Sequence, residues 1–559
     1  MKEPRQIFSN ALAHHRAGKF DKAEKLYKEV LSRVPDQVDC LHLLGVLATQ
    51  RGEYSVAIQF INRAIDQKKS KPVAEFHNNI GAAYKGLGQK KEAIHHFGLA
   101  ARLKPDYAEA FNNLGTVLTD NDDFDKAEKN FKRALSLNPK YAKAHCGLGN
   151  IALTQGRTEE ATKHYNQALV IDPNSLESHS NLGRAYVDLG CFDEAETCFR
   201  AALSINPNYA PAHYNLGTIF EELGLLDDAL SAYKQALTLN PKEPDYHWNT
   251  ALMQLLKGDY KAGWSEYEWR LRRSRKLVRD TGRVRWDGSN LTGRTILIQT
   301  EQGFGDTFQF IRYAQIVKEY DARVIIECQP KTERLIANVV GVDEVITRDQ
   351  SLPPVDCFIE LLSLPYLLET TLDTVPAPPS YICACPNLTR LWAERVNMTP
   401  GNKVGLVWRG NSLNTINSKK SIPINDLARL FTLDGISWFS IQLDASKSEL
   451  DTIRLSAPIE ECGPGLTDWE ETAALIANLD LVIAVDTGVA HLAGALGKPV
   501  WILLSHVPDW RWMTDRSDSP WYPSARLYRQ PALGDWTEVM GNVFRDLKEF
   551  TQKTNEVSP

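Results

Sequence analysis

The chain contains no run of eighteen apolar residues, and its first residues, Met1–Gln6, do not lead into an apolar segment of the kind that directs secretion. None of its nine cysteines forms a CxxC pair that a second such pair matches, and Cys383 and Cys385 have no histidine or further cysteine nearby. An excess of charge of one sign is also missing, because the formal net charge is only -6, although residues 270–285 are locally basic. We therefore expect a soluble, cytoplasmic protein with reduced thiols, no metal site, no nucleic-acid partner and no integral membrane segment.

The first half of the chain repeats with a period of 34 residues. Glycines recur at Gly115, Gly149, Gly183 and Gly217, and prolines recur at Pro105, Pro139, Pro173, Pro207 and Pro241. Each proline follows a run with helical apolar periodicity and ends that helix, while a small alanine in the second helix of each unit allows close packing. The period predicts seven helix pairs between about residues 4 and 243, with a stretched join around residues 68–71, and a degenerate eighth pair over residues 244–270.

This pattern resembles the tetratricopeptide repeat. The sixth unit, residues 176–209, carries the residues that recur in that family, namely Leu182, Gly183, Tyr186, Gly190, Ala195, Phe199, Ala202 and Pro207. The resemblance implies a right-handed superhelix whose concave surface is lined by the first helix of each pair. In this family that surface usually binds an extended peptide, so we expect an acceptor protein or peptide as a partner.

A column of amides occupies one position of the first helices, two residues before the repeat glycine. Its members are Asn79, Asn113, Asn181 and Asn215, with Gly147 interrupting the column in the fifth unit. Because an amide both donates and accepts, such a column can bind the backbone of an extended peptide without reading its sequence. The alternative is that these amides only satisfy contacts between neighbouring helices. The O-linked N-acetylglucosamine transferases carry a similar column, and this resemblance implies that the four residues bind acceptor peptide.

The second half alternates short apolar strands with helices. We expect strands at 295–299, 323–328, 344–346 and 357–360 and, after a proline-rich stretch and a hinge helix, at 403–408, 438–441, 481–485 and 500–504. Alternating βα units form doubly wound parallel sheets, here in two lobes with a cleft between them. The expected fold class is α plus α/β, with a repeat solenoid at 1–270, a basic linker at 271–292, and lobes at 293–400 and 401–559.

The strand at 481–485 breaks directly into a helix through Asp486, Thr487 and Gly488. A helix N-terminus at the carboxyl edge of a sheet offers free backbone N–H groups and the positive end of the helix dipole, which favour a phosphate. In the alternative interpretation Thr487 only caps the helix and His491 only packs in the core.

The turns Gly303-Phe-Gly-Asp306 and Asp486-Thr-Gly-Val-Ala-His491 together resemble the bacterial heptosyltransferase-like glycosyltransferases, which have the GT-B fold of two Rossmann-like lobes. The resemblance covers about residues 290–535, and it is greatest to the branch in which tetratricopeptide repeats precede this domain, through the segments 507–512 and 519–523. It implies an enzyme that works without a metal or other cofactor and uses a nucleotide-sugar as co-substrate.

The same resemblance implies roles for single residues. Asp306 is expected to be the catalytic base, which deprotonates the acceptor hydroxyl during transfer with inversion; the alternative is that it caps a helix beginning at Thr307. His491 is expected to donate to a phosphate or a sugar hydroxyl as a second catalytic residue. The expected donor-binding residues are Trp408, Lys419, Lys420, Gln442, Asp486, Thr487, Gly488 and His491, with either lysine supplying a positive charge to the diphosphate.

One loop departs from the family pattern. Asn414 stands where a histidine is expected and Ser418 where an arginine is expected, and an amide cannot take a proton at neutral pH. The leading hypothesis is an inverting, metal-independent glycosyltransferase that moves a sugar onto a Ser or Thr hydroxyl of a protein held by the repeats. The alternatives are an acceptor that is a saccharide or glycolipid, with the repeats recruiting a partner, and a noncatalytic repeat scaffold whose transferase domain has decayed.

Overall fold

The computed structural model describes residues 3–273, 278–410 and 420–557. The chain divides into two compact units, Met1–Ile219 and Phe220–Pro559. Lys419, Asn414 and Ser418 lie outside the described residues. The domain boundaries expected at residues 270, 292 and 400 stay predictions.

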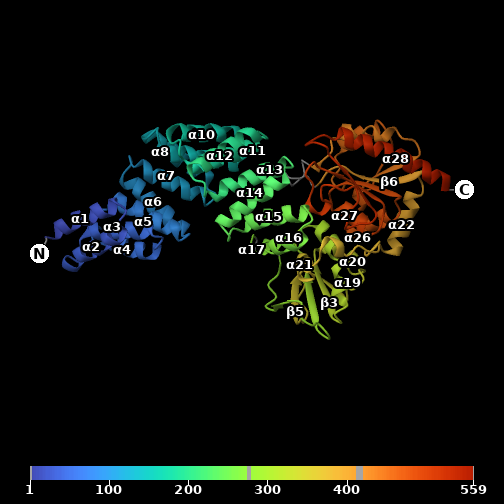
Figure 1. The fold of residues 1–559 in the computed structure, drawn as a ribbon, viewed down its shortest axis with the longest axis horizontal. Helices are drawn as coiled ribbons and strands as arrows, with labels where there is room; N and C mark the ends of the chain where they lie inside the picture. Colours follow the sequence, from blue (N-terminus) through green and yellow to red (C-terminus); the bar gives the residue numbers. More distant parts are fainter. Residues whose placement is uncertain (1–2, 274–277, 411–419, 558–559) are drawn as a thin grey trace. The chain divides into compact units, whose positions relative to one another are not determined.

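The first unit is built of helix pairs at the expected spacing (Figure 1). Its helices are α1 (Pro4–Arg16), α2 (Phe20–Arg33), α3 (Val38–Gln50), α4 (Tyr54–Asp66), α5 (Ala74–Gly86), α6 (Lys90–Leu103), α7 (Ala108–Thr119), α8 (Phe124–Leu137), α9 (Ala142–Thr154), α10 (Thr158–Ile171), α11 (Leu176–Asp188), α12 (Phe192–Ile205) and the start of α13 (Ala210–Glu222). The wider gap between α4 and α5 is the stretched join that the sequence predicts.

The repeat glycines mark the closest approach of the two helices of a pair. A Cβ atom on Gly115 would lie 2.8 Å from the ring of Phe131, and one on Gly183 would lie 2.6 Å from the ring of Phe199. Such distances are too short for carbon atoms, so a larger residue would push the helices apart. The 34-residue recurrence of glycine is therefore a packing requirement of the helix pair.

The second unit begins with helices that continue the repeat. They are α14 (Leu226–Leu239), α15 (Pro244–Leu256), α16 (Tyr260–Tyr267) and α17 (Arg270–Arg273), and α15 and α16 are the predicted degenerate eighth pair. Arg270, the first residue of the locally basic segment 270–285, is only 1% exposed and pairs with Glu268 and Glu301. The first residue of this basic segment is thus buried and paired.

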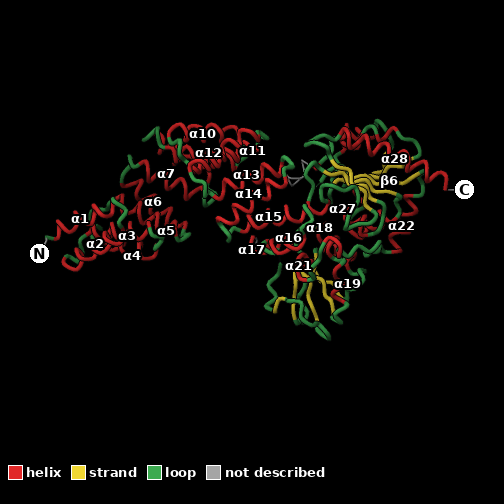
Figure 2. The backbone as a smooth tube through the Cα atoms, in the orientation of Figure 1, coloured by secondary structure: helices red, strands yellow, loops and turns green. Residues whose placement is uncertain are grey.

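Two separate parallel sheets follow, seen as two groups of yellow strands in Figure 2. The first has the order β1-β5-β2-β3-β4, with β1 (Val284–Arg285), β2 (Thr295–Gln299), β3 (Arg323–Cys328), β4 (Glu344–Thr347) and β5 (Cys357–Glu360). The second has the order β11-β10-β9-β6-β7-β8, with β6 (Asn402–Val407), β7 (Ile436–Ser440), β8 (Ile459–Glu461), β9 (Leu481–Val485), β10 (Val500–Leu504) and β11 (Ala525–Arg529). All pairings are parallel, so the α plus α/β fold class is confirmed.

Helices, most of them short, cover the two sheets. They are α18 (Phe304–Phe310), α19 (Tyr313–Lys318), α20 (Glu333–Ile336), α21 (Leu364–Leu367), α22 (Pro386–Val396), α24 (Ile424–Leu427), α25 (Lys447–Arg454), α26 (Trp469–Ala477), α27 (Gly488–Ala495) and α28 (Thr537–Val557). One core cluster joins one face of the second sheet to α25 and α28. None of the described helices has the length and apolar character needed to cross a membrane.

The two motif turns lie at equivalent places in the two sheets. β2 ends at Gln299 shortly before α18, and β9 ends at Val485 shortly before α27. The carboxyl ends of parallel strands are where doubly wound proteins bind their ligands. Every residue of β9 is buried, as the run of apolar residues predicts for a central parallel strand.

Candidate active site

A cavity of about 510 Å³ lies where the first turn of α18 meets the first turn of α27. It is lined by most of the residues that the sequence singled out, namely Asp306, Lys420, Gln442, Asp486, Thr487, Gly488 and His491. The structure therefore brings residues from both lobes to one cavity.

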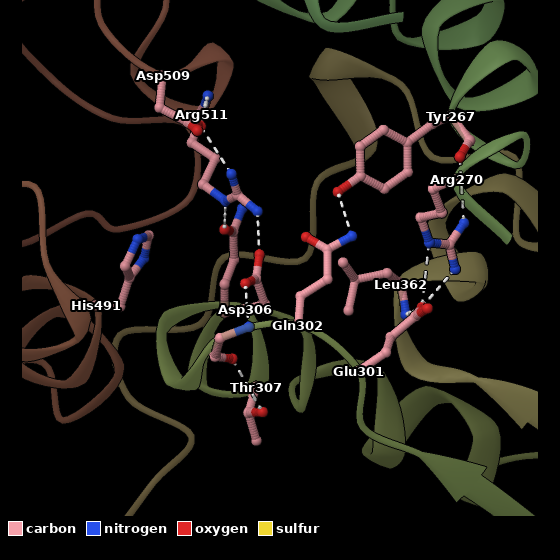
Figure 3. A network of polar contacts seen from close by, with 12 residues as sticks. Tyr267, Arg270, Glu301, Gln302, Asp306, Thr307, Leu362, His491, Asp509 and Arg511 are labelled. Atoms are coloured by element: carbon pink, nitrogen blue, oxygen red, sulfur yellow. Dashed lines mark hydrogen bonds and ion pairs between the residues drawn. The ribbon is translucent and has the colours of Figure 1, made fainter. Parts of the chain in front are cut away.

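Asp306 has two partners at this cavity (Figure 3). Its Oδ2 accepts the backbone N–H of Gly303 at 2.9 Å, and its Oδ1 accepts a hydrogen bond from the guanidinium of Arg511. The helix begins at Phe304 and not at Thr307, so Asp306 caps it from within the first turn. Burial raises the pKa of the Asp306 carboxyl, and the charge of Arg511 opposes this rise.

The glycines of both turns lie where a side chain has no room. A Cβ atom on Gly305 would lie 2.7 Å from Cδ2 of His491, and one on Gly488 would lie 2.9 Å from Cη2 of Trp469. Glycine at position 305 therefore lets α18 and α27 come together at the cavity, and glycine at position 488 lets the start of α27 pack against α26.

Asp486 holds Lys420 beside the first turn of α27. The Lys420 ammonium forms an ion pair with the Asp486 carboxylate, which also lies 3.8 Å from Nε2 of His491. Burial would lower the pKa of Lys420, but Asp486 and Asp509 raise it above its usual range. Burial would raise the pKa of Asp486, but Lys420 and His491 hold it below its usual range. Lys420 is thus a fixed positive charge at the cavity wall.

His491 both packs and lines the cavity. Its ring stacks on Trp512 with 5.1 Å between centroids, and its Nδ1 hydrogen-bonds the Tyr522 hydroxyl at 2.8 Å. Burial lowers the pKa of His491 to about 4 despite the nearby Asp486 carboxylate. A neutral imidazole at physiological pH can donate one hydrogen bond, but it supplies no positive charge.

The start of α27 presents unused hydrogen-bond donors. In the part of the chain that the structure describes, the backbone N–H groups of Gly488 and Val489 have no acceptor, and the buried Thr487 hydroxyl has no partner. Buried polar groups are rarely left unpaired, and an anion at a helix N-terminus satisfies such donors together. These three groups fit a phosphate.

Trp408 is not brought to the cavity. It is 1% exposed, belongs to the core of the second lobe and donates its indole N–H to Glu449 at 3.1 Å. Its neighbours Val407 and Arg409 line the cavity instead, because successive side chains of an extended segment point to opposite sides. Trp408 therefore does not line this cavity, and the expectation that it contacts the donor stays a prediction.

The amide column makes contacts between successive repeats. Each side-chain amide hydrogen-bonds a residue of the preceding first helix, as in Asn79 with His42 (2.7 Å), Asn113 with Asn78 (3.0 Å), Asn181 with Asn150 (2.9 Å) and Asn215 with Ser180 (3.3 Å). The contacts between neighbouring helices that the alternative interpretation requires are thus present. The four side chains nevertheless stay partly exposed. Gly147 interrupts the column because a Cβ atom there would lie 2.4 Å from Cζ of Phe131.

Comparison with known proteins finds a family match in each half of the chain. A family model for the cilia and flagella-associated protein 70 C-terminal domain, a tetratricopeptide repeat domain, matches residues 4–252, and the model for glycosyltransferase family 9 (heptosyltransferase) matches residues 456–514. The chain therefore combines a segment similar to tetratricopeptide repeats with a shorter segment similar to glycosyltransferase family 9.

Individual proteins match more loosely. Protein FlbA of Caulobacter vibrioides is 26% identical over 328 residues, which cover 54% of this chain and 54% of FlbA, so the chain spans about half the length of that relative. Superkiller complex protein 3 of Homo sapiens is 31% identical over 105 residues, which cover 18% of this chain and 7% of that protein. Among solved structures, the APC/C hetero-tetramer Cut9–Hcn1 (18% identity, TM-score 0.41) covers 49% of this chain and 53% of its own, and a tetratricopeptide repeat protein from Parabacteroides merdae (16% identity, TM-score 0.39) covers 45% and 98%.

The family 9 segment contains the β9–α27 turn and two cavity residues to which the sequence pattern assigned no role, Asp509 and Arg511. Arg511 pairs with both Asp306 and Asp509. Arg409, which precedes the loop outside the described residues, also lines the cavity and pairs with Asp444 and Glu449. The signal for Arg511 was its place in the segment 507–512, which resembles the repeat-bearing branch of the family.

Proposed function

We propose that the chain is an inverting glycosyltransferase that moves a sugar from a nucleotide-sugar donor to a Ser or Thr hydroxyl of a protein, without a metal ion. The family 9 match and the repeats support the coarser statement, a glycosyltransferase with tetratricopeptide repeats. The observation that supports the more specific proposal is the cavity at which Asp306 and the hydrogen-bond donors of α27 meet.

The first lobe contributes the base in this proposal. As the acceptor hydroxyl attacks the anomeric carbon, Asp306 takes its proton, and the bond to the nucleoside diphosphate breaks on the opposite face of the sugar. A carboxylate that burial makes more basic is suited to this step, provided that it stays ionised. Arg511 favours the ionised form and leaves Asp306 anchored on the helix.

The second lobe contributes stabilisation of the leaving group. The N–H groups of Gly488 and Val489 and the Thr487 hydroxyl are the donors for one phosphate, and Lys420 supplies a charge beside them. Fixed donors of this kind lower the barrier because they are already oriented where the negative charge of the diphosphate grows. With cationic side chains at the cavity, the proposed reaction needs no metal ion.

A test begins with the melting temperature of the full chain in the presence of UDP-, GDP- and ADP-linked sugars, since a bound donor raises it. With the stabilising donor, mass spectrometry of a Ser/Thr peptide library measures transfer. Asp306→Asn keeps the helix cap and should retain donor stabilisation while transfer falls about 10²–10⁴-fold. Asp343→Asn, which changes a half-exposed carboxylate of the same lobe, is the matched control and should transfer normally.

Retained transfer in Asp306→Asn would remove it as the base, and donor binding without transfer by the wild-type chain would favour the decayed scaffold.

A saccharide or glycolipid acceptor is the second candidate, because the amide column is engaged between repeats. The double variant Asn113→Ala and Asn181→Ala should raise the KM of peptide acceptors and spare donor hydrolysis if the column holds peptide. The control is Asn130→Ala with Asn166→Ala, whose amides donate to carbonyls of their own helices α8 and α10. Equal peptide kinetics in both pairs would favour the second candidate.

A further inference from the structure

The loop that carries Asp306 is held from the side by the last repeat helices of the second unit. Glu301 and Gln302 directly precede the helix cap at Gly303, and each contacts one side chain from the end of α16 or the start of α17 (Figure 3). The first contact is made by Arg270 and the second by Tyr267.

Arg270 makes a buried junction with the loop. Its Nε and Nη2 both donate to Oε1 of Glu301, the Nε bond measuring 3.2 Å, and Nη2 also donates to the Ser363 hydroxyl at 2.7 Å. Glu301 is fully buried, and the same Oε1 accepts the backbone N–H of Leu362 at 3.3 Å. Because two N–H groups of one planar guanidinium donate to the same oxygen, the direction of the Glu301 side chain is fixed.

Tyr267 holds the next residue. Its hydroxyl accepts a hydrogen bond from Nε2 of Gln302 at 3.4 Å, and the Gln302 backbone carbonyl accepts one from Gln329 at 3.2 Å. Gln302 has a φ of 59°, a left-handed conformation that is unfavourable for residues other than glycine. Such a conformation persists only where the surroundings hold it in place. The next residue, Gly303, donates its N–H to Asp306.

Stability alone does not account for this arrangement. A buried ion pair is rarely more stabilising than apolar residues of the same volume, because both charges must leave water. Within the described residues, moreover, Oε2 of Glu301 is buried without a hydrogen-bond partner. A cluster that leaves a buried oxygen unpaired but holds a strained loop in place is typical of functional sites.

We infer that Tyr267 and Arg270 are positioning residues for Asp306, and that through them the last repeat helices set the geometry of the base. The inference rests on the proposed function. Tyr267 and Arg270 do not line the cavity. They act through Gln302 and Glu301, whose placement determines where the capped carboxylate of Asp306 lies. Loss of either contact should therefore slow transfer without weakening the binding of the donor.

The test compares Tyr267→Phe and Arg270→Lys with a matched control, Arg285→Lys. Arg285 contacts the same Glu268 and Ser363 as Arg270, at 2.7 Å each, but it makes no contact with Glu301. For each variant kcat and KM are measured with the UDP-, GDP- or ADP-linked sugar that the wild-type chain uses and a Ser/Thr peptide, and the Kd of that donor is measured by calorimetry.

Tyr267→Phe and Arg270→Lys should lower kcat about tenfold or more with the donor Kd unchanged, because small misplacements of a base are costly. Arg285→Lys should stay within about twofold of the wild type. Tyr267→Phe removes one hydroxyl group and keeps the measurement informative if Arg270→Lys fails to fold. If both variants match Arg285→Lys, or if kcat and donor affinity fall together, the inference is wrong. Absence of transfer by the wild-type chain would instead overturn the proposed function on which it rests.

Discussion

Replacing Arg511 with methionine should destabilise the second unit strongly and in a pH-dependent way. Arg511 is only 7% exposed, and its guanidinium pairs with two carboxylates, Asp306 and Asp509, the latter at 2.7 Å. Methionine keeps most of the side-chain volume but removes the charge and all hydrogen bonds. Removing one partner of a buried ion pair costs about 3–5 kcal/mol near neutral pH, because the remaining carboxylate is left without compensation.

The pH dependence follows from the pKa of Asp306. Burial raises this pKa and Arg511 lowers it, so it should rise further in the variant. A carboxyl whose folded pKa exceeds its unfolded value contributes stability below the unfolded pKa, and that stability is lost as the pH rises through the folded pKa. The variant should therefore be least affected in acid, where a protonated Asp306 needs no cation, and most affected at alkaline pH.

Urea unfolding followed by tryptophan fluorescence reports on the second unit of the chain, which contains Arg511. All 13 tryptophans lie between Trp248 and Trp536 and so belong to that unit. With an m-value of about 3 kcal/mol/M, Arg511→Met should lower the midpoint by about 1–2 M at about pH 8 and by clearly less at about pH 5. Arg516→Met, which breaks a more exposed pair with Asp518, is the control and should cost at most about 1 kcal/mol. An equal loss at both pH values would refute the assignment of Arg511 as the group that keeps Asp306 ionised.

Three further substitutions test the packing and the donors of the described structure. Gly305→Ala places a methyl group 2.7 Å from the His491 ring, so it should cost about 1–3 kcal/mol in urea unfolding and weaken donor binding; unchanged stability would contradict the close approach of the two turns. Gly147→Asn completes the amide column, but its Cβ would lie 2.4 Å from Phe131, so calorimetry should show a lower melting temperature. A higher melting temperature would mean that packing does not explain why Gly147 interrupts the column. Thr487→Val removes a hydroxyl without a partner in the described residues, so the melting temperature should hold while donor Kd rises up to about tenfold; an unchanged Kd would show that this hydroxyl does not bind the donor.

The repeats could be predicted almost completely from the sequence because their information is local. Helix periodicity, a terminating proline and one glycine per unit recur within 34 residues, and the structure shows the corresponding helix pairs from α1 onward. The edge strands β1, β8 and β11 were not predicted. β1 and β8 are only two and three residues long and so leave little periodicity. β11 has five residues, but Arg526 and Arg529 interrupt its apolar run.

The helix after the first glycine turn was predicted three residues too late, at Thr307 and not at Phe304. Glycine has a low helix propensity, so Gly303 and Gly305 indicated a turn. The capping contact from Asp306 to Gly303, together with packing of Gly305 against His491, outweighs that preference. Local propensity failed here because a helix cap and packing against the other lobe together favour the helix.

Arg511 illustrates what no local pattern could supply. Its partner Asp306 lies 205 residues earlier in the chain, so neither residue predicts the other. The burial of Arg270 could not be predicted for the same reason, because its partner Glu301 lies 31 residues away. The basic composition of its segment gave no sign of this pairing. Charged residues in such a segment are usually solvated, and only the folded structure shows which of them is paired in the interior.

The two glycine turns are best understood as one structural unit. Taken separately, each is a common strand-to-helix connection with weak functional meaning. In the structure a side chain on Gly305 would collide with His491 of α27, while the space for a Cβ on Gly488 is limited by Trp469, with the N–H of Gly305 itself only 3.7 Å away. A side chain at Gly305 must therefore displace His491 of the other lobe, whereas a side chain at Gly488 must displace Trp469 of its own lobe. The requirement for glycine at both positions places the proposed base and the proposed phosphate donors at the same cavity, which neither turn could do alone.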